Sequence, residues 1–585
     1  MNRFVFAAKQ SDLQTRGCIT TQVDDHTVAL FAYGAHIYAI DNRCPHMGFP
    51  LHEGSVKDGI LTCHWHHARF DLTSGGTFDL FADDVRAFPV ELRGDEIWID
   101  VALHGDTRAH QEQRLHDGLE RNIPLVIAKA VIGLHQTSTE HDTDAFRIGL
   151  EFGTRYRQQG WGQGLTMLTC LMNLMPTLAP DDRARAMYHG LSAVARDCDN
   201  MPPRFTVQPL PGNTSDMNID IIETLTRWFR QFVEVRDSEG AERCIVSAIR
   251  TGADPRQLAG MLFAAVTDHR YIQIGHPLDF TNKALEALDQ VGWDPQLAEL
   301  ALAGLATGYT EASRMEESNA WRNPIDLIEM LAHAFEQLDT LPMVQTHDVS
   351  LQRDTLVTTL LSDVPQATVD ALLQALQHGT SPVELAGVVA YAAALRIARF
   401  HTSNEFGDWD TALHTFTFAN AVHQGLRRLQ SESYATHPPL VRGIFDAAMS
   451  LYLDRFLNVP PARLPSLSSH ALEPLGALLP LLDRQQQVDA AGNAVAQQLY
   501  GGVDSAEVIA LLGKLLLRED RDFHTIQCVE AAVRQHELLR GTPEATHVLI
   551  AAARYLAAHA PTMRAQGQTF NIAQRLARGE HLFEG

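Results

Sequence analysis

The sequence predicts a multidomain protein in which a small all-β domain is followed by a large all-α domain of repeated helical units. Its 585 residues are several times what one hydrophobic core usually supports. Short alternating runs separated by turn residues occupy the N-terminal part of the chain, which is typical of strands. Beyond that part, apolar residues recur at spacings of three and four, as on amphipathic helices, and some of these segments resemble one another.

The composition is that of a folded globular protein, with 45% hydrophobic and 20% charged residues. The formal charge of -24 would repel nucleic-acid phosphates, so we expect no nucleic-acid partner. The apolar runs at residues 4–8 and 385–395 are too short for a signal-peptide core and a membrane span, respectively. We therefore expect no membrane association and a cytoplasmic location. In such a chain the seven cysteines indicate metal ligation or burial rather than disulfides.

The first predicted domain covers residues 1–104, with strands expected at residues 27–33, 35–41, 59–62 and 96–101. Two loops between these strands contain a Cys-x-His pair and a Cys-x-x-His pair, separated by sixteen residues. Two thiolates and two imidazoles could bind one zinc ion tetrahedrally, and this alternative remains open from the spacing alone. The four candidate ligands are Cys44, His46, Cys63 and His66.

The residues around these pairs resemble the Rieske [2Fe–2S] family: Gly48, Leu51 and Gly54 follow the first pair, and Phe70, Asp71, Leu72, Thr73, Ser74 and Gly75 follow the second. The resemblance implies a [2Fe–2S] cluster in which Cys44 and Cys63 ligate one iron and His46 and His66 the other. Phe49 and Trp65 stand where the respiratory-complex branch has a second cysteine pair, so the likeness is to the ferredoxin and oxygenase branch. His64 and His67 replace the family's usual proline and glycine, and neither is expected to be a ligand.

Residues 105–122 are polar and are predicted to be a linker or a solvated helix between domains. The all-α domain is predicted to span residues 123–585. Three of its segments align: each starts at a glycine (252, 379 and 502) and ends, 24, 22 and 22 residues later, at a histidine. These histidines are His276, His401 and His524; a second aligned set contains His414 and His547, and a weaker earlier copy contains His189.

Stacked repeats bring equivalent positions to one common groove or axis. A single helical histidine is more often an ordinary core or surface residue, but the aligned set predicts a metal site, because neutral imidazole suits iron, zinc or copper. The predicted ligands of a mononuclear iron are His276, His401, His414, His524 and His547. Nearby groups are candidates for supporting or acid–base roles, or are ordinary helix-surface charges and caps: Asp268, His269, Arg270, Asp279, Lys283, Glu286, Asp408 and Asp410.

A second resemblance, carried by scattered residues, is to the questin oxidase-like proteins. The matching residues are His276-Pro277-Leu278, Ala284-Leu285-Glu286, His414, Thr417 and Ala421. That family is all-helical and is associated with oxidative cleavage of polycyclic aromatic polyketides. Some members hold a non-haem iron with several histidines and a carboxylated lysine. The resemblance implies iron ligation by His276 and His414, whereas Lys283 matches no family position.

Together these features predict a Rieske-cluster-containing oxidoreductase. The leading hypothesis is a non-haem iron oxygenase or oxidase acting on an aromatic or polycyclic small molecule, with the cluster feeding electrons to a mononuclear Fe(II). The chain has no Gly-x-Gly-x-x-Gly motif, so we expect a separate NAD(P)H-dependent reductase or ferredoxin reductase as partner. It also has no Asp-x-x-His-x₄₋₅-His segment of the usual catalytic partner domain. The alternatives are an electron-transfer protein with a helical docking scaffold, and a zinc hydrolase.

Overall fold

The computed structural model describes residues 3–23, 26–79, 81–102, 107–137, 143–205, 207–211, 221–341, 352–430, 438–466, 474–578 and 580. The chain forms two compact units. One contains Met1–Ile148 together with Ala565–Gly585, and the other contains Gly149–Arg564. The first unit includes the predicted β domain. We call the second the helical unit.

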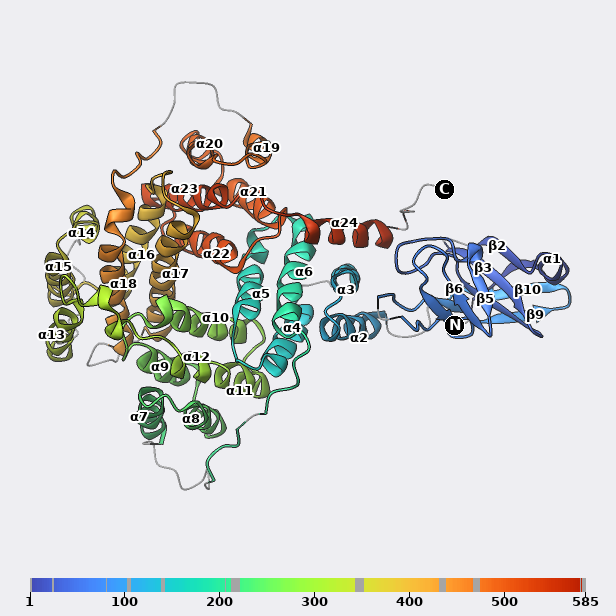
Figure 1. The fold of residues 1–585 in the computed structure, drawn as a ribbon, viewed down its shortest axis with the longest axis horizontal. Coiled ribbons are helices and arrows are strands. Elements are labelled where there is room, and N and C mark those ends of the chain that lie inside the picture. Colours follow the sequence, from blue (N-terminus) through green and yellow to red (C-terminus); the bar gives the residue numbers. More distant parts are fainter. Residues whose placement is uncertain are drawn as a thin grey trace. The chain divides into compact units, whose positions relative to one another are not determined.

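The β domain consists of three small antiparallel sheets (Figure 1). In β3 (His26–Tyr33) four consecutive residues are buried, and they alternate between two hydrophobic cores: Val28 and Leu30 belong to one, and Ala29 and Phe31 to the other. The first sheet has the order β1 (Phe4–Lys9), β10 (Glu96–Asp100) and β9 (Val90–Arg93). The second has β2 (Cys18–Val23), β3 (His26–Tyr33), β4 (His36–Asp41) and β8 (Ala87–Phe88), and the third has β5 (Ser55–Lys57), β6 (Ile60–Thr62) and β7 (Arg69–Asp71). The prediction of a small all-β domain is confirmed, with one short helix, α1 (Gln10–Arg16), that the pattern did not indicate.

One hydrophobic core of the β domain lies directly beneath the two Cys/His loops. Its buried members include Phe31 and Ile40 of the second sheet and Leu61 and Phe70 of the third. Cys44 and Cys63 belong to the same buried cluster. Burial of this apolar surface therefore holds the two loops, which come from different sheets, against each other.

Three helices complete the first unit: α2 (Thr107–Glu120), α3 (Pro124–Thr137) and α24 (Ala565–Ala577). The polar segment predicted as a linker or solvated helix contains α2. The C-terminal helix α24 packs against α3, although they are more than 400 residues apart in the sequence. The domain boundaries at residues 104 and 122 that the sequence suggests stay a prediction.

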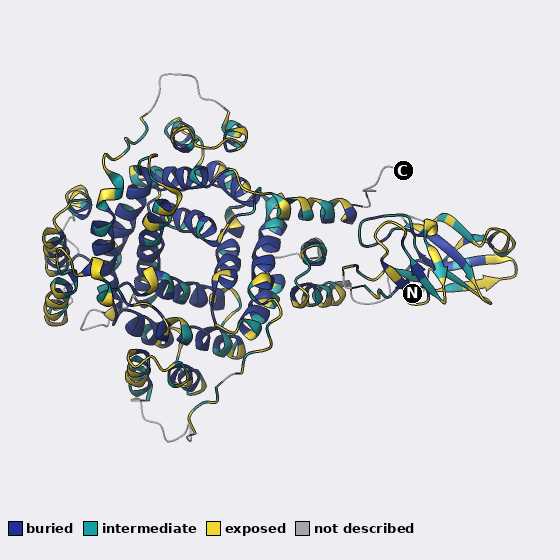
Figure 2. Cartoon of the chain, in the orientation of Figure 1, coloured by how far each residue is buried: buried dark blue, intermediate teal, exposed yellow. Residues whose placement is uncertain are grey.

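In the helical unit, outer helices pack around an inner set of helices (Figures 1 and 2). Each inner helix contacts the next, so that the four close a ring: α5 (Gln163–Leu174), α10 (His276–Gln290), α17 (Phe406–Leu429) and α22 (Phe523–Leu538). The outer partners of these four include α6 (Pro180–Asp197), α9 (Pro255–Val266), α16 (Pro382–Ala398) and α23 (Pro543–Ala558). This confirms the predicted large all-helical region.

Further helices extend the outer layer or flank it. They are α4 (Thr143–Tyr156), α7 (Ile221–Glu234), α8 (Ser238–Arg250), α11 (Pro295–Ala303), α12 (Ala306–Thr310), α13 (Leu327–Thr340), α14 (Arg353–Leu360), α15 (Pro365–Gln377), α18 (Arg442–Leu453), α19 (Leu478–Leu481), α20 (Val488–Tyr500) and α21 (Ser505–Leu517). Among the described residues, none of these helices has both the length and the apolar character that a bilayer crossing requires.

The three aligned segments begin in the same way. Gly252, Gly379 and Gly502 have φ values of 86°, 89° and 85°, the left-handed region that glycine adopts without strain. Two residues later, Asp254, Ser381 and Asp504 cap the N-termini of α9, α16 and α21 through their side chains. The helices that follow differ in length, with 12, 17 and 13 residues respectively. The repeat is therefore regular at its start and irregular after the first helix.

Asp454, which follows α18, gives the helical unit a predicted pH dependence. Its carboxyl is buried, and Thr415 Oγ1 donates a hydrogen bond to it at 3.0 Å. Burial raises the pKa of Asp454 from 3.8 to about 7, although Thr415 and Arg396 act in the opposite direction. Between about pH 4 and 7 the folded chain therefore keeps a proton that the unfolded chain releases, so the free energy of unfolding falls as the pH rises through this window.

We expect Asp454→Asn to flatten this decline, as measured by urea denaturation between pH 5 and 8. The matched control is Asp370→Asn, at an exposed position of α15. An unchanged pH slope in Asp454→Asn would contradict the assignment.

Candidate metal centres

The first Cys/His loop (residues 43–50) follows β4 and closes on itself through backbone hydrogen bonds. The Cys44 N–H donates to the Phe49 carbonyl at 2.8 Å, and the Gly48 N–H donates to the Cys44 carbonyl at 2.8 Å. Gly48 has a φ of 84°, which explains why glycine stands there. The backbone thus turns tightly around the Cys44 side chain.

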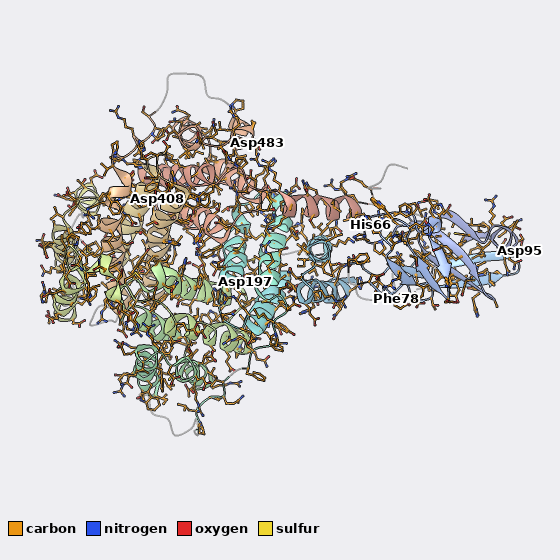
Figure 3. All side chains as sticks on the ribbon, in the orientation of Figure 1. His66, Phe78, Asp95, Asp197, Asp408 and Asp483 are labelled. Carbon is orange, nitrogen blue, oxygen red and sulfur yellow. The ribbon has the colours of Figure 1, made fainter. Side chains whose placement is uncertain are left out.

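The second Cys/His loop (residues 63–68) connects β6 to β7, and the Cys63 N–H donates to the Ala68 carbonyl at 2.8 Å. His67 has a φ of 60°, so this histidine occupies a left-handed position that glycine would adopt without strain. His66 is exposed at the tip of the loop and is labelled in Figure 3. Phe49 and Trp65 link the two loops through a ring contact, with centroids 6.1 Å apart.

The structure brings all four predicted side chains of these loops together. Cys44 and Cys63 are buried and hydrogen-bond to each other. The rings of His46 and His66 are in edge-to-face contact, with centroids 4.7 Å apart. The hydrogen bond from Cys44, together with the Trp65 and His66 backbone N–H groups, outweighs burial and lowers the pKa of Cys63 to about 6. Burial, and then the His66 and Lys129 charges, lowers the pKa of His46 to about 4.

The donor set fits the [2Fe–2S] cluster that a Rieske domain implies. His46 Nδ1 is buried without a hydrogen-bond partner, which is costly for an imidazole nitrogen unless another group occupies that position. The two loops thus provide two buried thiol groups and two imidazoles, that is, two sulfur and two nitrogen ligands. All seven cysteines are free, so no disulfide competes for Cys44 or Cys63.

A second cluster of potential ligands lies inside the helical unit. His276 is the first residue of α10, His414 lies on α17, and His524 is the second residue of α22. One ring nitrogen from each lies within 4.8 Å of the others, and the His414 and His524 Nε2 atoms are 3.0 Å apart. We call these residues the histidine triad. Three inner helices thus each contribute one imidazole to one point.

The triad is electrostatically suited to a cation. Burial, and then the neighbouring imidazoles, lower the pKa of His276 to about 4 and that of His414 to about 3. The pKa of His524 is also lowered, chiefly by burial, while Asp410 and Asp522 act in the opposite direction. All three rings are therefore neutral near pH 7, the protonation state in which imidazole binds metals.

The structure does not bring His401 or His547 to the triad. His401 lies in the connection before α17, where its Nδ1 is 2.6 Å from Ser403 Oγ. The helix before it, α16, is four to five residues longer than α9 and α21. Counting the same number of residues from the starting glycine therefore reaches a position before α17 begins. His414, eight residues into α17, takes the third position instead.

His547 and His189 lie on outer helices. His547, on α23, has its Nδ1 2.8 Å from the hydroxyl of Tyr391. His189, on α6, is buried beside Tyr188. The second aligned set of histidines therefore does not share one environment, since only His414 of that set reaches the inner ring.

A carboxylate lies one helical turn before the triad. Asp410 precedes His414 by four residues on α17, so both point to the same face. The Tyr555 hydroxyl donates to Asp410 Oδ1 at 2.5 Å, and His559 Nε2 is 3.4 Å from the same oxygen. Tyr555 and His559 come from α23 and its C-terminus and have no motif signal in the sequence. Asp408 instead forms a capping box with Glu405 at the start of α17, as its alternative interpretation predicts.

Beyond the triad, the facing sides of α10 and α22 meet through buried polar pairs in the same order along both helices. Gln527 donates to Asp279 across a separation of 248 residues, and Lys283 pairs with Glu530 across 247. The near-constant separation shows that the two helices run parallel to each other. Burial raises the pKa of Asp279 to about 7, and the Lys283 charge only partly offsets this.

Lys283 is the centre of a buried charge network. Its Nζ lies 3.0 Å from Glu286 Oε2 and 2.8 Å from Glu530 Oε2, and it is 1% exposed. Arg534 pairs with the same two carboxylates at 3.0 and 3.1 Å. Asn173 of α5 donates to both of them, at 2.8 and 3.0 Å. Two cations and two anions thus neutralise each other at the middle of the inner ring.

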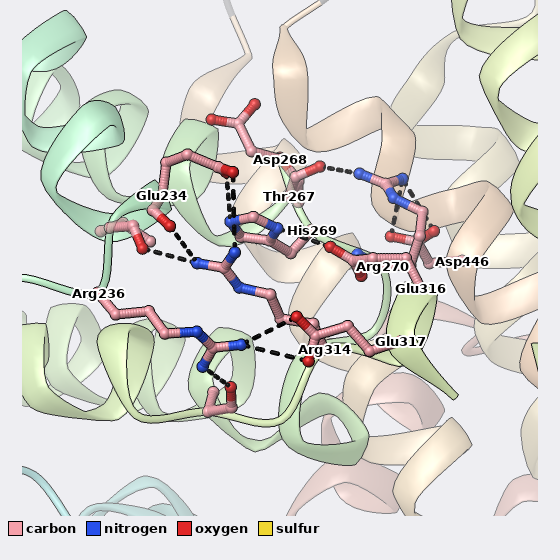
Figure 4. Close-up of polar contacts among 12 residues, drawn as sticks. Glu234, Arg236, Thr267, Asp268, His269, Arg270, Arg314, Glu316, Glu317 and Asp446 are labelled. Carbon is pink, nitrogen blue, oxygen red and sulfur yellow. Dashed lines mark hydrogen bonds and ion pairs between the residues drawn. The ribbon is translucent and has the colours of Figure 1, made fainter. Parts of the chain in front are cut away.

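The residues 268–270 belong to a different network, which anchors the chain before His276 (Figure 4). His269 Nδ1 is 2.7 Å from Glu316 Oε1, and the Arg270 guanidinium pairs with buried Asp446 at 3.0 Å. After this anchor, Tyr271, Gln273 and Ile274 have φ values of 40°, 45° and 50°. Such left-handed residues are strained and persist only where the surroundings impose them. The network therefore positions the start of α10 rather than joining the triad.

Comparison with known proteins places the N-terminal residues in a family. The Rieske [2Fe-2S] domain model matches residues 3–89. The p-cumate 2,3-dioxygenase system ferredoxin component of Pseudomonas putida is 31% identical over 81 residues, covering 14% of this chain and 69% of the relative. The 3-phenylpropionate/cinnamic acid dioxygenase ferredoxin subunit of Escherichia coli (strain K12) is 37% identical over 76 residues, covering 13% and 72%.

A longer relative is Apoptosis-inducing factor 3 of Mus musculus, 25% identical over 186 residues, which are 31% of this chain and 27% of the relative. The ferredoxin relatives match over most of their own length, and the matched family model contains both Cys/His loops. Through residues 3–89, this chain belongs to the Rieske [2Fe–2S] domain family.

Proposed function

We propose that this protein is an iron-dependent oxidoreductase with two metal centres, in which the Rieske domain supplies electrons to a non-haem iron in the helical unit. The observation that carries the proposal is the convergence of His276, His414 and His524 from three inner helices. A redox domain in the same chain favours iron over zinc, which has no redox chemistry.

At the first centre, Cys44 and Cys63 would hold one iron of the cluster, and His46 and His66 the other. The cluster, when bound, supplies one-electron transfer. The side chains contribute in two ways. Burial of both cysteines excludes water from the sulfur ligands, and the exposed edge of His66 leaves one imidazole accessible from solvent.

At the second centre, the triad would hold a mononuclear Fe(II), which supplies the capacity to activate dioxygen beside a substrate. Three imidazole ligands leave coordination positions free for exogenous molecules. Asp410 accepts a hydrogen bond from the Tyr555 hydroxyl one helical turn before His414, and would hold that hydroxyl in position beside the site.

The proposed substrate is an aromatic or polycyclic small molecule. The rings of Phe280 and Phe523 lie 5.6 and 5.3 Å from that of His276, which gives the triad an aromatic border. The two ferredoxin relatives are named for dioxygenase systems of aromatic acids. Electrons would come from a separate NAD(P)H-dependent reductase or ferredoxin reductase, because the sequence has no dinucleotide fingerprint.

Anaerobic metal and acid-labile sulfide analysis of the whole chain tests this proposal. We expect about three irons and two sulfides per chain, two of the irons belonging to the cluster. About two irons and two sulfides with no further metal would overturn the oxygenase proposal and favour an electron carrier whose helical unit is a docking surface. Zinc in place of the third iron would favour hydrolytic chemistry.

A further inference from the structure

Lys129 of α3 reaches the first Cys/His loop from outside the β domain. Its Nζ donates to the carbonyl of Pro45, the residue between Cys44 and His46, and pairs with Asp83 at 2.8 Å. The Lys129 side chain is only 9% exposed. A cavity of about 290 Å³ has Cys44, Pro45 and Lys129 among its lining residues.

The charges around Lys129 do not cancel. Asp83 is 8% exposed and also pairs with Arg114 of α2 at 2.8 Å, so two cations share one carboxylate. One net positive charge therefore remains in a largely buried position beside the loop. Charges in such positions are screened less by water and salt than surface charges.

The packing on this side of the loop is close. Gly48 is buried, and a Cβ added there would lie 3.2 Å from Leu576 Cδ2 of α24. Helix α24 packs in turn against α3, the helix that contains Lys129. The first loop is thus approached by side chains from two helices outside the β domain, Lys129 of α3 and Leu576 of α24.

We propose that Lys129 is a positioning and charge-setting residue for the cluster, and that it raises the cluster's reduction potential relative to a neutral residue at the same position. Reduction adds one electron, supplied by the reductase, and so adds one negative charge to the cluster. A nearby positive charge stabilises that reduced state, and Asp83 moderates the effect. The inference rests on the proposed ligation by Cys44, His46, Cys63 and His66.

The test is a redox titration of the full chain, followed by visible absorption and electron paramagnetic resonance. For Lys129→Met we expect a shift of the reduction equilibrium of roughly tenfold towards the oxidised cluster, equivalent to a midpoint lower by ~59 mV. For Asp83→Asn we expect a higher midpoint, because Lys129 and Arg114 then lack their counter-charge. The control is Lys57→Met, which removes an exposed lysine of β5 and should leave the midpoint unchanged.

Opposite shifts in the two variants distinguish an electrostatic role from a purely structural one, which would move both in the same direction or neither. An unchanged midpoint in Lys129→Met, or a lower one in Asp83→Asn, would overturn the inference. If Lys129→Met does not assemble the cluster, the direction of the Asp83→Asn shift decides alone. Absence of a Rieske spectrum from the unmodified chain would instead refute the proposed ligation.

Discussion

Replacing His276, His414 and His524 together by alanine is expected to remove one iron per chain and to leave the Rieske cluster in place. The three imidazoles come from three different inner helices, and no other ring or carboxylate in the described part of the chain joins them in a metal-sized group. Loss of all three leaves no ligand set at this point. The measurement is the iron and acid-labile sulfide content per chain. We expect iron to fall from about three to about two atoms, while sulfide stays at about two.

The matched control is the double variant His401→Ala and His547→Ala. It removes two histidines from the same unit, each of which contacts a hydroxyl group outside the triad. Its iron content should equal that of the unmodified chain. Loss of iron in the control, or its retention in the triad variant, would contradict the assignment. The Rieske spectrum should be present in both variants, because the four cluster residues lie in the other compact unit.

Replacing Lys283 by methionine is expected to destabilise the helical unit by about 3–5 kcal/mol, the range measured when one partner of a buried ion pair is removed. Glu286 and Glu530 would then keep Arg534 as their shared cation, together with the neutral donor Asn173, in a buried position. Lys283 and Arg534 now lower the pKa of Glu286 against the opposing effect of burial, and the contribution of Lys283, the larger of the two, would be lost. Denaturant unfolding, followed by circular dichroism, measures the change.

Lys514→Met is the control for this variant, because Lys514 lies exposed on α21 and should change the stability by about 0.5 kcal/mol or less. The double variant Lys283→Met with Glu530→Gln removes one charge of each sign. It should be less destabilised than the sum of the two single variants, because the buried charges again balance. Equal stability of Lys283→Met and Lys514→Met would show that the buried network contributes nothing to folding.

The two candidate metal centres differ in how clearly the sequence indicates them, because their ligands are separated by different numbers of residues. Cys44, His46, Cys63 and His66 lie within 23 residues, and one strand and one hairpin suffice to bring them together. Their spacing therefore indicated four candidate ligands, and the resemblance of the neighbouring residues to the Rieske family implied the cluster. His414 and His524 are 110 residues apart, and their meeting depends on how complete helices pack.

The repeat argument identified two members of the triad from the glycine count and the third from the second aligned set. Counting residues from the starting glycine located both His276 and His524, because α9 and α21 are nearly equal in length. It did not apply to His401, because α16 is longer and α17 starts later. The counted residues therefore end in the connection before α17, and His414, further along that helix, lies in the triad instead.

By itself, the sequence determined the fold class, the order of the two parts, the Cys/His loops and the repeated helix starts. These properties depend on local patterns: alternation, helical periodicity, and glycine with a capping residue. Only the tertiary structure decided which three of the five predicted histidines converge, that Lys283 faces Glu530, and that Lys129 reaches Pro45. The reason is physical, since pairing across hundreds of residues is set by the packing of whole helices, which no local pattern encodes.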